Sequence, residues 1–492
     1  MLFKPPRLGP GAVYLRSLDG LFRTNGDLIR IAEIEPQIFW TKPTSPGSNP
    51  RGSSLERRRI AALPQQTLTH GVGFPVGGTI CDHENHIAEF RLWNEELTSP
   101  WTSEHLSILS LRGAAGPQPC GFLMPPLQTE SGVKLAAQNI RRRRAALGVP
   151  FAVETGVNYF LRRDCEMPDG DFFAAIAEEA DCGILLDLTN LWSNQKNGRA
   201  RIADIVAKLP LERVWEVHLA GLELERGYWV DAHSGGIDPD LAAIAGDVIS
   251  SLPNLGAIIF ELAPDRVSAL DEASYLKEIE TLHLLWEKAR RPPANSRPIV
   301  SPLPEAEPDG MPDMWEQVIA HRMLPAANRP EGPASAIPLT TADEERFSLY
   351  TYLAASFRTG ALADLLGNTL RLLQLAIGKK EVGDLLDRYI AATAPVVFPT
   401  DEALQFRRYM DAHPLPVPGF EEMLKFESVL IQAAADSTTV RATFYKDIDV
   451  MLTDLAAGNL PGPSSDRAAT LLEIGVDPVP FVRICDSARA GA

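Results

Sequence analysis

Histidine and acidic residues recur in short apolar segments of the first 290 residues of this 492-residue chain. Such segments are expected to be buried, and a buried carboxylate or imidazole without a partner costs several kcal/mol. Bound metal is the simplest compensation, and imidazole with carboxylate but no cysteine favours Fe, Mn or Zn. The segments are TLTHGV with His70, TSEHL with Glu104 and His105, FAVETG with Glu154, LLDLTN with Asp187 and Asn190, VWEVHLAG with His218, WVDAHSG with Asp231 and His233, and IIFEL with Glu261.

The number of these residues indicates more than one ion. Taken singly, a buried His or Asp is more often a hydrogen-bonded structural group than a ligand. Four of the nine histidines of the chain, however, belong to this set. Eight or nine potential ligands exceed what one ion can use, so we infer two or three metal ions.

The elements that must position these residues are short β-branched runs that alternate with segments of helical period. Strands that alternate with helices predict parallel βαβ units, and eight of them predict a (β/α)8 TIM-type barrel, an α/β fold. The active site of such a barrel lies at the carboxyl ends of the strands, where the polar residues fall. A doubly wound open sheet is the alternative. The expected strands lie in residues 9–15, 29–36, 66–74, 102–109, 150–156, 182–190, 213–221 and 255–262.

The chain changes character after the expected barrel, which takes up residues 1–290. Residues 291–341 are dense in proline, which disfavours regular helix and central strand, and predict a linker with one short helix around Asp313 to Met323. Residues 342–492 carry apolar residues at a spacing of three to four, and we expect a mostly α-helical domain without strands.

Composition limits the classes of function. The formal net charge of −17 disfavours general binding to nucleic acid or to anionic membrane surfaces. No segment has the length of a membrane span and the N-terminus has no signal-peptide pattern, so we expect a cytoplasmic protein. The five cysteines are scattered, which fits a reducing compartment.

The segments LTHGVGFPVGG, SEHL, FAVETGVNYF, GILLDLTN, VWEVHLAG, VDAH and FEL, in this order, resemble the multinuclear non-heme iron-dependent oxidative enzymes. This barrel family includes the methanobactin biosynthesis oxidase, and the resemblance runs from about Pro6 to Leu285. It implies two or three iron ions of mixed ferrous and ferric state, dioxygen as co-substrate, and oxidation of cysteine, or sometimes another residue, in a ribosomally made precursor peptide. The implied ligands are His70, His105, Glu154, Asp187, Asn190, His218, Asp231, His233 and Glu261.

Other residues near the motifs are expected to contact the substrate: Glu104, Asn158, Trp192 and Trp229. The helical part, about residues 342–460, resembles the partner proteins that accompany these oxidases and help to present the peptide. Such a fusion would raise the effective concentration of one part for the other. An unrelated helical bundle is the alternative, and a separate partner protein would then be expected.

Two other functions fit parts of the pattern. Xylose-isomerase-like isomerases and hydrolases also place His, Asp and Glu at strand ends around divalent ions. The sugar isomerases generally need a positioned lysine, which the strand-end motifs lack. A non-catalytic peptide-binding scaffold is the third hypothesis, but a scaffold has no reason to keep polar strand ends that cost stability.

Overall fold

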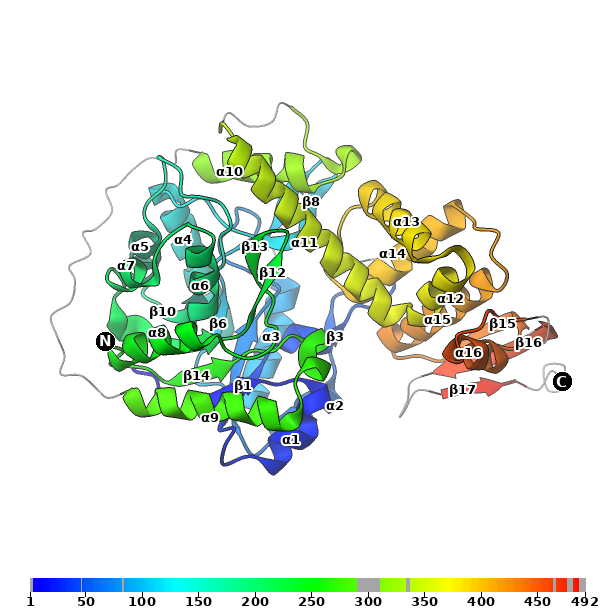
Figure 1. Ribbon diagram of the computed structural model, residues 1–492, viewed down its shortest axis with the longest axis horizontal. Coiled ribbons are helices and arrows are strands. Elements are labelled where there is room, and N and C mark those ends of the chain that lie inside the picture. Colours follow the sequence, from blue (N-terminus) through cyan, green and yellow to red (C-terminus); the bar gives the residue numbers. More distant parts are fainter. Residues whose placement is uncertain are drawn as a thin grey trace.

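Eight parallel strands close into a barrel in the computed structural model (Figure 1). This confirms the predicted (β/α)8 barrel and excludes the open sheet. The strands follow one another around the barrel in chain order, and β14 closes it by pairing with β1. They are β1 Gly9–Val13, β2 Ile31–Ile34, β5 Gln66–Gly71, β6 Thr102–His105, β9 Phe151–Glu154, β10 Gly183–Asp187, β11 Val214–Leu219 and β14 Ala257–Phe260. The structure describes residues 3–45, 47–81, 84–289, 310–332, 337–462, 466–475 and 481–485.

Helices surround the barrel and bury apolar side chains against the outward faces of the strands. Their ends are capped as the sequence directs: the Thr129 hydroxyl accepts the N–H of Gly132 at the start of α4, and Gly148 with φ +72° ends that helix. Among the described helices, none has the length and apolar character needed to cross a bilayer. The barrel helices are α1 Asp19–Thr24, α2 Ser54–Ala61, α3 Glu84–Leu97, α4 Glu130–Leu147, α5 Asp169–Ala180, α6 Leu188–Lys196, α7 Ile202–Val206, α8 Pro239–Ser250 and α9 Glu272–Lys288.

The inward faces of the barrel strands change from apolar to ionisable at their carboxyl ends. Side chains two residues apart lie on the same face of a strand. Buried apolar residues of the barrel interior are followed, two positions later, by an acid or a histidine. The pairs are Ile31 and Glu33, Leu68 and His70, Ala152 and Glu154, Leu185 and Asp187, and Ile259 and Glu261. The packed lower layers therefore support a polar upper layer.

Three antiparallel hairpins extend the carboxyl end of the barrel. Of these, the hairpin after β11 ends in Asp231, which therefore lies on a strand outside the barrel. The hairpins are β3 Trp40–Thr41 with β4 Arg51–Gly52, β7 Ile108–Gly113 with β8 Gly116–Met124, and β12 Leu222–Glu225 with β13 Tyr228–Asp231.

The C-terminal part is mostly helical, as predicted, and the long helix α11 runs between it and the barrel (Figure 1). The expectation that it has no strand is wrong, because β15, β16 and β17 form a three-stranded antiparallel sheet. The alternating apolar pattern that would predict β15 is short, because it consists of Val440, Ala442 and Phe444, which face α15. The elements are α10 Met311–Met323, α11 Thr341–Leu365, α12 Gly367–Ile377, α13 Lys379–Ala392, α14 Pro399–Ala412, α15 Phe420–Asp436, β15 Val440–Lys446, α16 Ile448–Ala456, β16 Asp466–Gly475 and β17 Phe481–Ile484.

Both parts of the chain are joined by packing as well as by sequence. The predicted short helix is present as α10, and its Trp315 belongs to one apolar cluster with Tyr159 of the barrel and Tyr350 of α11. Residues 290–309 and 333–336 of the predicted proline-rich linker lie outside the described residues. The limits of the domains stay predictions.

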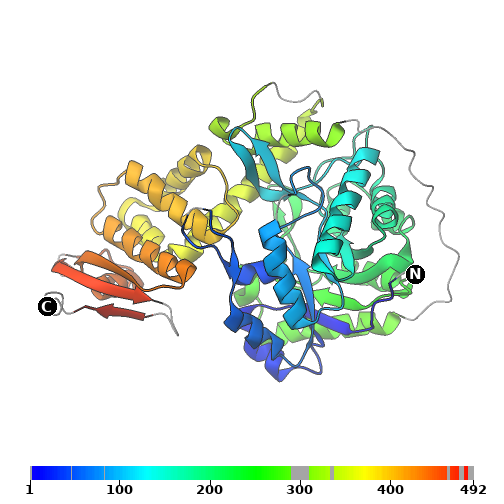
Figure 2. The ribbon, with the colours of Figure 1, turned by 180° about the vertical axis from the view of Figure 1, so that it is seen from behind.

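A second contact joins the β3–β4 loop to the helical part, as the reverse view shows (Figure 2). Lys42 Nζ lies 2.9 Å from Asp401 Oδ2. The backbone N–H and the hydroxyl of Thr44 each donate to the Asp436 carboxylate over 2.7 Å. These polar contacts hold the helical part against the barrel.

The contact between Glu316 of α10 and Thr79 of the barrel depends on pH. The Glu316 carboxylate is 4% exposed and accepts the N–H and the hydroxyl of Thr79, both at 2.5 Å. Burial raises the pKa of Glu316 from 4.5 to about 7. The folded chain then binds this proton more tightly than the unfolded chain, so its stabilising effect is complete below pH 4.5 and is lost as pH rises through about 7.

We therefore predict that Glu316→Gln removes this part of the pH dependence. Between about pH 4.5 and 7.5, the free energy of unfolding of the wild type should fall relative to that of the variant by up to about 3 kcal/mol. Urea unfolding of both proteins at each pH measures the difference. A difference that stays constant with pH would contradict the prediction.

Candidate metal centre

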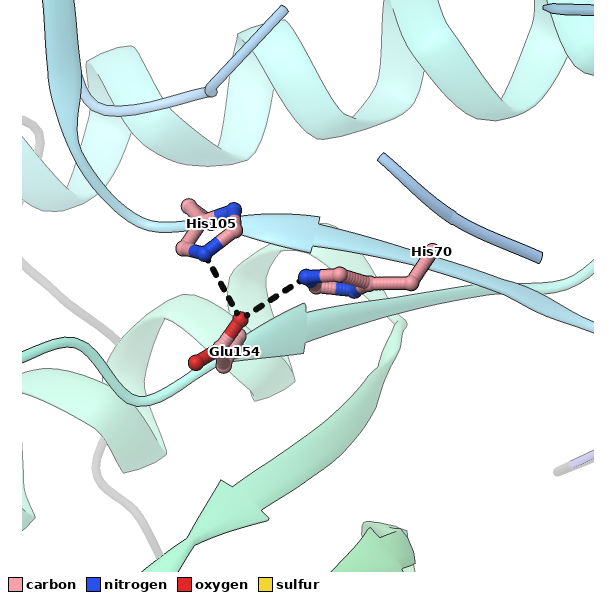
Figure 3. A group of neighbouring side chains, drawn as sticks. All are labelled: His70, His105 and Glu154. Atoms are coloured by element: carbon pink, nitrogen blue, oxygen red, sulfur yellow. Dashed lines mark ion pairs between the residues drawn. The ribbon is translucent and has the colours of Figure 1, made fainter. Parts of the chain in front are cut away.

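His70, His105 and Glu154 converge at the carboxyl ends of three neighbouring strands, β5, β6 and β9 (Figure 3). The Nε2 atoms of both imidazoles lie 3.3 Å from the same carboxylate oxygen, Glu154 Oε2. One ligand atom of each residue lies within 4.8 Å of the others. Two imidazoles and one carboxylate with open positions are the donor set typical of non-heme Fe(II) sites.

Hydrogen bonds on the far side of each imidazole orient the pair. His105 Nδ1 faces two acceptors at 3.1 Å, Gly71 O and Glu104 Oε1, so this nitrogen carries the proton. His70 Nδ1 lies 2.8 Å from Ser103 Oγ. His105 Nε2 is thereby directed toward Glu154, and metal-binding histidines are oriented in the same way through their other ring nitrogen.

A second group lies around His218 of β11. Its Nδ1 lies 2.9 Å from Glu261 Oε1, and the other oxygen of Glu261 lies 3.2 Å from His233 Nε2. His233 Nε2 is also 3.1 Å from Asp231 Oδ2. His70 links the two groups, because its ring centroid is 4.7 Å from that of His105 and 5.6 Å from that of His218.

Asn190 anchors the two carboxylates between these groups. Its backbone N–H donates to Asp187 Oδ1 over 2.7 Å, which makes Asp187 the N-cap of α6. Its side-chain Nδ2 donates to Glu154 Oε1 over 3.1 Å. One oxygen of each carboxylate is therefore held, while Asp187 Oδ2, Glu154 Oε2 and Asn190 Oδ1 have no hydrogen-bond partner among the described residues.

The structure thus brings all nine predicted ligands to one end of the barrel. Four overlapping sets could each hold an ion: His70 with His105 and Glu154; Glu154 with Asp187 and His218; Asp187 with Asp231 and His233; and Glu33 with His218 and Glu261. Buried carboxylate oxygens without hydrogen bonds, including Asp231 Oδ1 and Glu261 Oε2, are what a divalent cation would satisfy. The donor set therefore fits two or three ions. Assignment of each residue as a ligand stays a prediction.

The pKa values show an excess of buried negative charge. Burial raises the pKa of Glu154, and burial together with the Asp231 and Glu261 carboxylates raises that of Asp187. Although burial alone lowers it, the neighbouring carboxylates Glu154 and Glu104 raise the pKa of His105 to about 10. The eight barrel strands contain no Lys or Arg. The buried carboxylates therefore outnumber the positive charges beside them, and bound cations would supply the missing positive charge.

Sequence reasoning missed three acids beside the site. Glu33 on β2 lies 3.1 Å from His218 Nε2, and Glu216 on β11 accepts the indole N–H of Trp101 over 2.9 Å. Glu35, just after β2, has its pKa raised to about 7 by burial and by Glu261. The alternation in IRIAEIEP was a usable signal, because it places Glu33 and Glu35 on one face.

Backbone strain accompanies the hairpin side of the site. His233 has φ +44°, the left-handed region that costs energy for a residue with a Cβ. Gly221 makes this turn possible, because a Cβ there would lie 1.7 Å from Ser234 O. The segment after β11 can fold back against the turn of His233 only with glycine at this position.

The residues predicted to contact the substrate lie around the site but not all face it. Glu104 is fully buried, and its carboxylate accepts the N–H groups of Phe74 and His105. Asn158 Oδ1 accepts the N–H of Phe160 within a loop. Both side chains are engaged in hydrogen bonds within the protein, and their contact with a substrate stays a prediction. The indoles of Trp192 and Trp229 lie 4.7 and 4.4 Å from Lys196 Nζ, beside the hairpin of Asp231.

The fold and site define a (β/α)8 barrel with a buried carboxylate and imidazole centre suited to several cations. Residues 49–280, which contain all nine predicted ligands, match the family model of the RiPP precursor modification enzyme MbnB/TglH/ChrH, where RiPP denotes a ribosomally made and modified peptide. The barrel is similar to this family over these residues, which confirms the resemblance seen in the motifs.

Relatives named UPF0276 protein are similar to part of the chain. The protein of Streptomyces avermitilis is 28% identical over 46% of this chain, and the match spans 47% of that relative, about half its length. The protein of Anaeromyxobacter sp. is 29% identical over 41% of this chain and 70% of the relative. That of Chromobacterium violaceum is 28% identical over 44% of this chain and 77% of the relative.

Solved structures share the architecture at low similarity. A D-psicose 3-epimerase of Clostridium cellulolyticum with D-tagatose is 10% identical with a TM-score of 0.40, over 57% of this chain and 99% of that chain. An L-ribulose 3-epimerase is 15% identical with a TM-score of 0.38, over 58% and 96%. These likenesses say nothing about the reaction of the present chain.

Because the carboxylates of the site are crowded, we predict that Asp187→Asn has opposite effects on stability with and without bound metal. Asp187→Asn keeps an oxygen to cap α6 but removes a buried negative charge. In chelator-treated protein at pH 7 we expect the variant to be more stable than the wild type by about 1–2 kcal/mol, because the carboxylates repel one another. In metal-loaded protein we expect it to gain less stability than the wild type.

Thermal unfolding with and without metal measures both effects. Asp271→Asn is the matched control, because Asp271 caps α9 in the same way, through the N–H of Ser274, but lies outside the site. Its response to metal should equal that of the wild type. An Asp187→Asn variant that is less stable than the wild type in both states would contradict the prediction.

Proposed function

We propose that this protein is a multinuclear non-heme iron oxidase that uses dioxygen to modify a residue, cysteine, of a ribosomally made precursor peptide. The observation that carries the proposal is the convergence of two imidazole Nε2 atoms on one oxygen of Glu154, beside two further groups that are linked to it through the carboxylates of Glu154 and Asp187. The match of residues 49–280 to this family model supports peptide modification as the class of reaction.

The residues of the chain prepare the site for such a reaction. Bound iron would supply one-electron chemistry with dioxygen and would lower the pKa of a substrate thiol. Glu104 and Gly71 O hold the proton of His105 on Nδ1, which keeps Nε2 available. Asn190 holds one oxygen of Glu154 and one of Asp187, so that the free oxygens point to common positions. Exposure of 3% or less at Glu154, Asp187 and His218 excludes bulk water.

We also propose that the helical part takes the place of a separate partner that presents the peptide. The Lys42 and Thr44 contacts with Asp401 and Asp436 support this, because they seat the helical part beside the barrel. A precursor peptide bound to the helical part would then be held near the site at a high effective concentration.

Metal analysis of anaerobically purified protein tests the iron assignment. We expect two or more irons per chain by elemental analysis, with a ferrous component in the Mössbauer spectrum. His105→Ala should lose at least one iron, because His105 Nε2 is one of the three donor atoms that converge at Glu154 Oε2. His413→Ala is the control, since His413 is exposed on the helical part and contacts Tyr409 O. Stoichiometric Zn or Mn without iron would instead favour the isomerase or hydrolase.

The peptide assignment needs a substrate. We expect that co-expression with a short cysteine-containing peptide encoded beside the gene changes the mass of that peptide, in air and with iron present. The His105→Ala protein should leave its mass unchanged. A metal-loaded protein that changes none of the neighbouring cysteine-containing peptides, with or without air, would contradict this part of the proposal.

A further inference from the structure

Helix α11, from the C-terminal part of the chain, holds both backbone groups of a barrel residue near the metal centre. The N–H of Tyr159 donates to Tyr350 Oη over 3.1 Å, and Arg346 Nε donates to the carbonyl of Tyr159 over 2.5 Å. The rings of Tyr159 and Tyr350 pack at 5.2 Å, with 1% and 0% exposure. Tyr159 belongs to the loop after β9, the strand that carries Glu154.

Tyr159 in turn holds a predicted ligand. Its hydroxyl accepts the backbone N–H of Asp231 over 3.2 Å. Asp231 lies on β13, which forms a two-stranded sheet with β12 apart from the barrel sheet. The strand pairing that fixes ligands such as His70 and Glu154 therefore does not fix Asp231.

Further contacts from α11 reach the same hairpin at its tip. Tyr352 donates its hydroxyl proton to Glu225 Oε2 over 3.1 Å, and the guanidinium of Arg226 lies 4.1 Å from the ring of Tyr352. On the barrel side, Asn197 bonds both backbone groups of Trp229. The hairpin is thus held between the end of α6 and α11. At Asp231 itself, the hydrogen bond to the backbone N–H comes from the Tyr159 hydroxyl.

We propose that Tyr350 is a positioning residue of the metal centre, which acts through Tyr159 to fix Asp231 and with it the ion between Asp187, Asp231 and His233. The helical part is then a structural component of this centre as well as a neighbour of it. The inference rests on the proposed metal centre, but not on iron being the metal.

Tyr350→Phe tests the inference, because it removes only the oxygen that accepts the Tyr159 N–H. A buried N–H left without an acceptor, and a ligand whose support is lost, should weaken one metal site about tenfold. Tyr159→Phe, which removes the acceptor of the Asp231 N–H, should have the same effect. Anaerobic titration with Fe(II), read as the dissociation constant and stoichiometry of each class of site, measures it.

Tyr352→Phe is the matched control. It removes a hydroxyl from the same helix that contacts the same hairpin, but at Glu225, away from Asp231. We expect metal binding equal to that of the wild type. Unfolding temperatures of the three variants within a few degrees of the wild type would show that each is folded.

A double-mutant cycle separates positioning from general stability. In an Asp231→Asn background, Tyr350→Phe should weaken metal binding no further, because the ligand through which Tyr350 acts is already changed. Wild-type metal affinity in Tyr350→Phe, or equal losses in Tyr350→Phe and Tyr352→Phe, would overturn the inference. A wild type that binds Zn or Mn but no iron would contradict the iron oxidase, and the same titration with that metal would still test Tyr350.

Discussion

The structure depends on an excess of buried carboxylate at one end of a parallel barrel. Glu154, Asp187 and Glu261 stand on packed apolar layers, and no barrel strand offers a Lys or Arg to neutralise them. The histidines take up part of this charge, yet carboxylate oxygens remain without hydrogen bonds in a site that water barely reaches. Cations are the physical requirement of this arrangement, and the helices, hairpins and loops can be understood as the means of holding their ligands.

Support for that site comes from beyond the barrel. Glu316 of α10 holds Thr79, in the segment that follows β5 and His70, while α11 reaches the β9 loop and the β12–β13 hairpin. Ligands on barrel strands are fixed by strand pairing, but those on the hairpin depend on neighbouring segments. The hairpin side also contains the strained backbone of His233, as is common where a structure holds a functional group in place. The second half of the chain therefore contributes to the precision of the site.

The sequence predicted the barrel because the two periods of strand and helix are strong and local. It also predicted which strand ends carry ligands, since His70, Glu154 and Asp187 interrupt apolar runs. The alternation in IRIAEIEP places Glu33 on one face of its strand, but only the barrel closure brings that face to His218. The hydrogen bonds of Glu104 to the Phe74 and His105 N–H groups could not be predicted, because they depend on how the loop after β5 folds against β6. The contact of Tyr350 with Tyr159 spans 191 positions and has no local signal.

Anomalous diffraction from crystals of anaerobically purified protein tests the central claim most directly. Data collected on both sides of the iron absorption edge locate iron without reference to activity or substrate. The account predicts at least two iron peaks, one beside His70, His105 and Glu154 and another among Asp187, Asp231 and His233. Ordered side chains in the same positions with no anomalous peak at the iron, zinc or manganese edges would contradict it.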